Sequence, residues 1–209
     1  YGQAVPHHYV DFGSSAMAGV LGADMEYVDK ETIWAYPVLE SVEQICDVSI
    51  NEATTAFRVI FETTRRSAER ARNHHYIAPF ALEGMSDLLA ALYGTESFMM
   101  DLVMTPDAVK RAMNHCKELW LAAFAHVQDE IARSGNDGGI GWAGIWAPGT
   151  TFPIQEDVAY MISPEMFGEF LMPHILDEID AMDYPFFHLD GIGMIPHLDH
   201  LLGIEKLKV

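Results

Sequence analysis

The stretch Tyr184–Gly193, read Y-P-F-F-H-L-D-G-I-G, decides how the chain is interpreted. Its apolar run is followed by His188, Leu189, Asp190 and two glycines, a pattern that predicts a buried strand leading through a loop into a helix. Side chains two apart on a strand share a face, so His188 and Asp190 should project together from its carboxyl end. In α/β proteins ligands bind at that end of the strands.

An imidazole and a carboxylate placed in this way suit three kinds of chemistry. They can bind a divalent metal, act as an acid/base pair, or hold a polar substrate. The structural alternative makes His188 a hydrogen-bonded core histidine and Asp190 the cap of the next helix. The residues alone leave both interpretations open.

The charge of the chain limits the classes of partner. Its 209 residues, half of them hydrophobic, carry 31 acidic and 12 basic side chains and a net charge of −19. Such a field repels nucleic acid and anionic lipid. We therefore expect a globular protein that binds no nucleic acid.

Location is indicated by the apolar runs and the cysteines. No run approaches the roughly 20 residues of a membrane span, and no cleavable signal is visible, so no membrane partner is expected. Cys46 and Cys116 lack C-x-x-C spacing. Scattered cysteines of this kind suit reduced thiols in a cytoplasmic protein.

Strand-like and helix-like stretches alternate along the sequence. Strands are expected at 5–12, 75–82, 140–146 and 184–187, and helices at 51–72, 86–93, 106–133, 164–182 and 193–202. This order predicts a parallel sheet with crossover helices. Residues 32–37 are expected to form an aromatic loop. There is no G-x-G-x-x-G or P-loop, so nucleotide binding of those kinds is not supported.

Acidic residues follow the expected strands, and in a closed barrel such strand ends converge on one mouth. The predicted fold is therefore a (β/α)₈ barrel, an α/β architecture, that has lost its two ends. At the mouth we assign Asp11 to substrate binding and Glu83, Glu156 and Asp157 to catalysis.

Four arginines stand near the end of the expected helix 51–72: Arg65, Arg66, Arg70 and Arg72. They complement the negative end of the helix dipole as a solvated terminus. An anion site is the alternative interpretation.

Three segments carry a resemblance to a known family. Ile162–Phe167 reads I-S-P-E-M-F, the later strand exit reads His188-Leu189-Asp190-Gly191, and Pro79–Gly94 is followed by Thr105-Pro106-Asp107. Together they resemble the uroporphyrinogen decarboxylase superfamily, and they cover most of residues 76–209. The family fold is a (β/α)₈ barrel.

The resemblance implies that residues 1–209 form a single barrel domain lacking its first strand and its last one or two strands. Such a barrel exposes sheet edges. We expect those edges to be covered by another chain, as in a homo-oligomer, or by further parts of a longer protein.

The superfamily contains porphyrinogen decarboxylases and zinc-dependent methyltransferases that pass a methyl group between a corrinoid protein and a thiol or an O-methyl compound. The chain has no counterpart of the decarboxylases' arginine-rich motif, and its charge opposes a polyanionic porphyrinogen. The resemblance therefore favours a methyltransferase with a small O- or S-methyl substrate and a corrinoid protein as partner. The alternatives are a decarboxylase or lyase on a smaller carboxylated substrate, and a non-catalytic module that binds a small ligand or the corrinoid partner.

The resemblance also implies a metal site. These methyltransferases hold zinc with a His and a Cys two apart and with a later Cys; here His188 keeps the first position and Asp190 stands in the second. Zinc accepts carboxylate oxygen, so His188 and Asp190 would bind zinc, with Glu156 or Asp157 completing the site or acting as base. The alternative is a branch that lost zinc and uses the pair for hydrogen bonding.

Two tryptophans are candidate walls of the substrate pocket. Trp142 and Trp146 lie on the third expected strand and just before a turn-rich loop. Their alternative role is packing in the barrel and helix core.

Overall fold

The structure contains two pairs of parallel strands, as expected from the alternation of strands and helices in the sequence. The computed structural model describes residues 4–28 and 33–207. The two parallel pairs are β1 (His7–Tyr9) with β4 (Tyr76–Ala78), and β7 (Pro153–Ile154) with β8 (Phe186–Phe187).

Helices account for much of the remaining structure. They are α1 (Ala16–Val20), α2 (Thr55–Ala71), α3 (Met85–Tyr93), α4 (Thr95–Met104), α5 (Pro106–Ala132), α6 (Pro164–Met166), α7 (Met172–Asp180) and α8 (Leu198–Leu201). A π-helical segment, η3 (Phe167–Leu171), joins α6 to α7, and 3₁₀ segments are η1 (Val42–Asp47), η2 (Asp157–Met161) and η4 (Ile192–His197).

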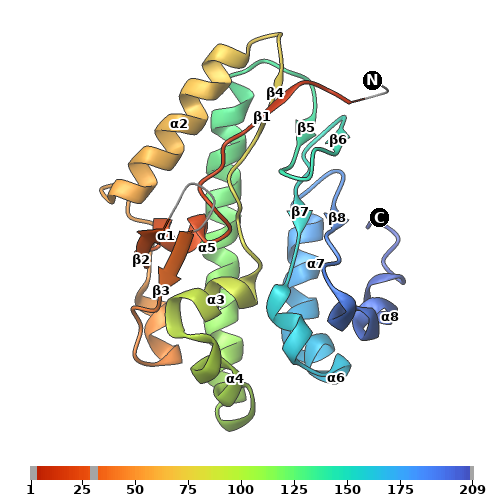
Figure 1. Ribbon diagram of the computed structural model, residues 1–209. Helices are drawn as coiled ribbons and strands as arrows, with labels where there is room; N and C mark the ends of the chain where they lie inside the picture. The colour runs from red at the N-terminus through yellow and green to blue at the C-terminus, as the bar shows by residue number, and fades with distance from the viewer. Residues whose placement is uncertain (1–3, 29–32, 208–209) are drawn as a thin grey trace.

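The helices that follow β4, β7 and β8 gather at one end of the molecule. In Figure 1, α3, α6 and α8 all lie in the lower half, below the strands that lead into them. The carboxyl ends of the two parallel pairs therefore point toward the same end. This is the arrangement in which residues that follow different strands can meet.

α5 is the helix around which the core packs. Apolar residues three or four apart place one stripe on one helix face, and Met113, Cys116, Trp120 and Phe124 on that stripe are buried. The Trp120 ring stacks on Phe124 with centroids 5.0 Å apart, and its Nε1 donates to the Leu82 carbonyl at 2.6 Å. The indole thereby ties the segment after β4 to the core.

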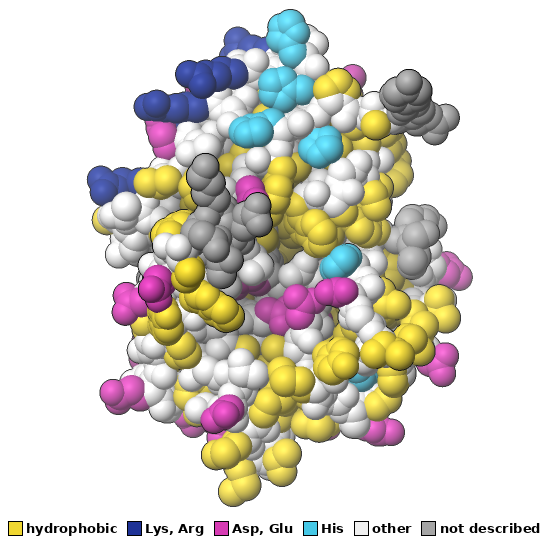
Figure 2. Space-filling model, viewed as in Figure 1, with side chains coloured by type: hydrophobic (Ala, Val, Ile, Leu, Met, Phe, Trp, Pro, Cys, Tyr) yellow, Lys and Arg dark blue, Asp and Glu magenta, His cyan; other side chains and the backbone are white. Residues whose placement is uncertain are grey.

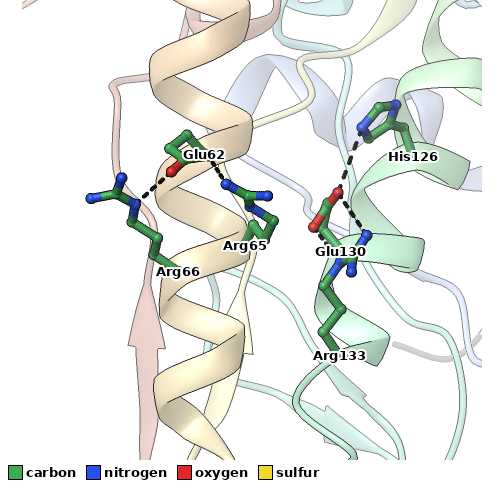
Figure 3. A network of polar contacts seen from close by, with 6 residues as sticks. All are labelled: Glu62, Arg65, Arg66, His126, Glu130 and Arg133. Carbon is green, nitrogen blue, oxygen red and sulfur yellow. Dashed lines mark hydrogen bonds and ion pairs between the residues drawn. The ribbon is translucent and has the colours of Figure 1, made fainter.

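Two of the four arginines near the end of α2 form ion pairs with an acid of the same helix. Arg65 and Arg66 both pair with Glu62, while Glu130 on α5 pairs with Arg133 and lies 4.0 Å from His126 (Figure 3). Pairs three or four residues apart face each other on a helix surface. Arg65 and Arg66 therefore balance Glu62 on the helix surface, while Arg70 stands in the last turn of α2, where a cation complements the helix dipole.

The aromatic segment 32–37 was expected to be a loop, and this expectation is wrong over its described part. Ile33–Tyr36 is strand β3, which pairs antiparallel with β2 (Asp24–Tyr27). Thr32 lies outside the described residues. Alternating exposed and half-buried side chains explain the strand: Trp34 and Tyr36 face solvent, and Ile33 and Ala35 face inward.

The expected strand at 140–146 is a hairpin instead. β5 (Gly139–Ile140) pairs antiparallel with β6 (Trp146–Ala147), and the Gly144 amide donates to the Gly141 carbonyl in the turn between them. Gly144 has a φ of 73°, a conformation that glycine adopts without strain. The run therefore folds back, and β7, which the sequence did not indicate, supplies the parallel strand.

The fold is a mixed helix and strand architecture with small two-stranded sheets. The helix starts at Pro106 and Pro164 and the stop at Gly94 are confirmed. Barrel closure, the single-domain assignment and the number of missing strands stay predictions. Over residues 4–28 and 33–207, no helix is both long and apolar enough to cross a membrane.

Candidate active site

His188 stands at the exit of β8, as the sequence predicts. Its backbone amide donates to the Ile154 carbonyl at 2.7 Å, which continues the β7–β8 pairing by one residue. Its half-buried ring meets the Trp142 ring edge to face, with centroids 4.8 Å apart. The strand pair and the indole together fix the position of the imidazole.

Two carboxylates lie near this imidazole. Asp157 opens η2 directly after β7, Asp190 follows β8, and both are exposed. Burial of part of the carboxyl raises the pKa of Asp157, the charge of Asp190 adds to the rise, and His188 opposes it. The structure thus brings Asp157 within electrostatic reach of both His188 and Asp190.

Glu156 accepts hydrogen bonds from the first residues of α3. It is buried, and its carboxyl accepts the backbone amides of Met85 and Ser86, both at 3.0 Å, and the Ser86 hydroxyl. Gly84 permits this approach, since a Cβ there would overlap Gln155 and Glu156. We therefore leave Glu156 out of the proposed catalytic set.

Asp87 on α3 makes the reciprocal contact with the start of η2. Its carboxyl accepts the backbone amides of Asp157 at 2.9 Å and Val158 at 2.8 Å. α3 and η2 thus cap each other through Glu156 and Asp87. Burial raises the pKa of both carboxyls, and the charge of Asp157 adds to the rise at Asp87 as that of Asp87 does at Glu156. The sequence offered one signal for this residue, an acid in the first turn of the expected helix 86–93.

Glu83 is buried without a hydrogen-bond partner of normal geometry on either oxygen. Burial raises its pKa well above the usual range, Asp87 adds to the rise, and the Ala18 backbone amide opposes it. A second buried carboxyl that the sequence did not indicate, Glu178 on α7, has one unpartnered oxygen and a pKa raised by burial and by Glu156 and Asp87.

The described contacts of Asp11 and Trp146 are with residues other than His188. Asp11 follows β1, accepts the Gly13 backbone amide at 2.9 Å, and helps to raise the pKa of Tyr9 to about 12, mainly an effect of burial. Trp146 on β6 meets the ring of Tyr76, the first residue of β4, at 6.2 Å. That position is at the amino end of β4, whereas His188 follows the carboxyl end of β8 (Figure 1).

The side chains expected to bind zinc are not arranged as a complete metal site. Among the residues that the structure describes, no three His, Cys, Asp or Glu side chains are grouped so that they could hold a metal ion. His188, Asp190 and Asp157 have suitable chemistry and lie in one corner, but they do not converge. The zinc site on His188 and Asp190 stays a prediction.

A cleft of about 460 Å³ adjoins this corner. It lies between the β2–β3 hairpin, α3 and η2, and its lining includes Trp34, Asp87, Asp157 and Met161. Figure 2 shows acidic side chains beside a histidine near the middle of the viewed face, bordered by hydrophobic side chains.

Gly193 allows η4 to pack against η2 beside the site. A Cβ at Gly193 would overlap the Tyr160 ring. We expect Gly193→Ala to displace η4 and lower the free energy of unfolding by about 1–3 kcal/mol, the usual cost of overpacking. Urea denaturation measures this, with Gly203→Ala as control, because a Cβ at Gly203 would meet no atom within 4 Å. Equal effects of the two substitutions would contradict the packing role.

Similarity to known proteins is found in the structure and not in the sequence. No protein-family model matches the sequence, and no curated protein matches it either. The fold matches 14 solved chains. One is a methyltransferase from Methanosarcina mazei, with a TM-score of 0.66 and 15% identity over 93% of this chain and 54% of that one. The chain therefore spans about half of that structure, and at this identity the likeness concerns the fold.

Proposed function

We propose that this chain is the substrate-binding part of a methyltransferase of the uroporphyrinogen decarboxylase-like type, with its parallel strands belonging to a (β/α)₈ barrel. It would move a methyl group between a small O- or S-methyl compound and a corrinoid protein. The observation that carries the proposal is that Asp157 lies within electrostatic reach of both His188 and Asp190, after two parallel strands of a fold that also occurs in a methyltransferase.

The residues of this corner have separable tasks. When a thiol accepts a methyl group it loses a proton, and Asp157, whose pKa is raised, is suited to take that proton beside His188. Trp142 holds the imidazole from its edge and walls the site. A bound zinc, held by His188 and Asp190, would supply Lewis acidity, and Asp157 would act as the base.

An apolar rim supports a protein partner. Tyr160 and Met161 on η2 and Ile192 and Ile195 on η4 are all more than half exposed. η2 packs against η4, so these side chains border the site on one side. Clustered exposed apolar side chains mark interaction surfaces, as a corrinoid protein would require.

Zinc retention and methyl transfer test the proposal together. The chain is loaded with zinc, dialysed and analysed for metal, and methyl transfer from methylcobalamin to 2-mercaptoethanol is followed by corrinoid absorbance. We expect about one retained zinc per chain, and its loss in Asp190→Asn but not in Asp129→Asn, an exposed control on α5. Methyl transfer by zinc-free protein would contradict the proposed metal site. Absence of both zinc retention and methyl transfer would contradict the methyltransferase proposal.

A decarboxylase or lyase is the second candidate. The raised pKa of Asp157 beside His188 favours it, because a carboxyl poised for protonation can serve as general acid without a metal. Loss of CO₂ from a small carboxylated substrate by zinc-free protein would support this candidate over the first.

A further inference from the structure

The cleft beside Asp157 has a lining of one charge sign. Among the residues that the structure describes, its lining contains Asp87 and Asp157 and no Lys, Arg or His. Glu26 lies outside this lining; it stands opposite Trp34 in the β2–β3 hairpin, on the same face, where its carboxylate accepts the Tyr36 hydroxyl. The cleft is therefore a negative pocket on a chain whose net charge is already −19.

The rest of the lining is apolar and aromatic. Trp34 is 58% exposed and Met161 52% exposed, and Ala90, Ala91 and Val158 complete the apolar surface. An indole face attracts a cation through its quadrupole, and the attraction grows when the cation is partly desolvated. A large tryptophan left open to solvent beside carboxylates is therefore suited to a cation that also carries apolar groups.

The hydrogen bonds that the two carboxylates already accept indicate which kind of cation the cleft can bind. Asp87 already accepts the amides of Asp157 and Val158, whereas no hydrogen bond to the Asp157 carboxyl is seen among the described residues. The described part of the chain offers no three grouped metal donors here. A cation without N–H groups needs charge and contact rather than many acceptors, and the cleft supplies both.

We propose that this cleft binds a small organic cation, a methylated ammonium or sulfonium group, between the Trp34 ring and the carboxylates of Asp157 and Asp87. The inference rests on the proposed function. It adds N-methyl compounds to the O- and S-methyl substrates proposed there and requires the substrate to carry a positive charge. Asp157 belongs both to the cleft and to the corner with His188, so a methyl group on the bound nitrogen or sulfur would lie beside the reacting groups.

Binding of choline tests the proposal against its neutral isostere, 3,3-dimethylbutan-1-ol, in which carbon replaces the charged nitrogen. Calorimetric titration of the zinc-free chain at low salt should show choline binding at least about 10-fold more tightly than the alcohol. Trp34→Ala and Asp157→Asn should each weaken choline about 10-fold or more. Trp146→Ala is the matched control, since Trp146 is also an exposed tryptophan but lies on β6.

Each other outcome overturns the proposal. Equal binding of choline and the alcohol would show an apolar pocket, and an equal effect of Trp34→Ala and Trp146→Ala would place the ligand elsewhere. Displacement of choline by equimolar Mg²⁺ would show an inorganic cation site, and absence of choline binding would leave no organic cation site. The titration needs neither zinc nor methyl transfer, so its failure is distinguishable from failure of the methyltransferase proposal.

Discussion

Replacing His188 with Ala is expected to lower methyl transfer by about 100-fold or more, because it removes a proposed zinc ligand and with it the Lewis acidity of the metal. Folding should be nearly unchanged. The ring is half-buried, and its described contact is the edge-to-face pair with Trp142, while its backbone amide, which bonds Ile154, survives the substitution. Turnover per folded molecule and melting temperature, measured on one preparation, give the two quantities.

His115→Ala is the matched control for that experiment. His115 on α5 has a ring nitrogen 2.8 Å from the Val48 carbonyl, so its removal leaves a partly buried acceptor without a partner. We expect a loss of about 1–3 kcal/mol of stability with turnover per folded molecule intact. If His188→Ala behaved in this way instead, with lost stability and unchanged turnover, His188 would be a structural histidine.

Stability of the chain is expected to fall steeply as the pH rises through neutrality. Burial raises the folded-state pKa of Glu83, Glu156 and Glu178 above their ordinary value of 4.5. A carboxyl of this kind gives its full contribution below the unfolded pKa and loses it as the pH rises through the folded pKa. The loss therefore starts near pH 4.5 and continues above neutrality.

His174 acts in the opposite direction over part of this range. Burial, with Lys117 nearby, lowers the pKa of this buried histidine to about 4, while Asp177 opposes the change. It therefore costs stability as the pH falls below its unfolded value of 6.5. Between about pH 6.5 and 8.5 the histidine contributes nothing, so the decline there reports the carboxyls.

Glu178→Gln tests the contribution of one of these three buried carboxyls to the pH dependence of stability. Glu178 is faced by Glu156 after β7, by Asp87 on α3 and by Asp177 on its own helix. The substitution keeps its shape and removes the charge, so we expect a gain of about 2–4 kcal/mol near pH 8 and little change near pH 4.5. Urea denaturation at each pH measures both values.

Glu118→Gln is the control for the buried carboxyl. Glu118 is exposed on α5, so its substitution should change stability by less than about 0.5 kcal/mol at any pH. Added salt separates the two effects further, because it screens repulsion on the surface and leaves a buried charge almost unscreened. A gain from Glu178→Gln that did not depend on pH would contradict the role of its charge.

Local signals explain which elements the sequence predicted. Pro106, Ser163 with Pro164, and Gly94 fix helix ends through bonds within a few residues, and the Ser163 side chain does accept the Met166 amide. The strand exit at His188 followed from an apolar run and two glycines. These features need no knowledge of the distant chain.

The hairpin at 139–147 shows where local pattern fails. An apolar run with glycines suits a strand or a turn, and the choice depends on whether the run pairs with itself or with a distant segment. Here Gly139 pairs with Ala147, and β7 takes the place beside β8. Sequence spacing alone does not distinguish these pairings.

Local patterns sufficed for three helix ends, at Gly94, Pro106 and Pro164, and for the exit of β8 at His188. Folding separated the acids that follow the strands into buried and exposed ones. Glu156 and Asp157 are neighbours in sequence, yet one is buried on the amides of α3 and the other stays exposed beside His188. The reason is physical: the α3 amides that take Glu156 are 70 and 71 residues away, so only folding brings that competing partner to it.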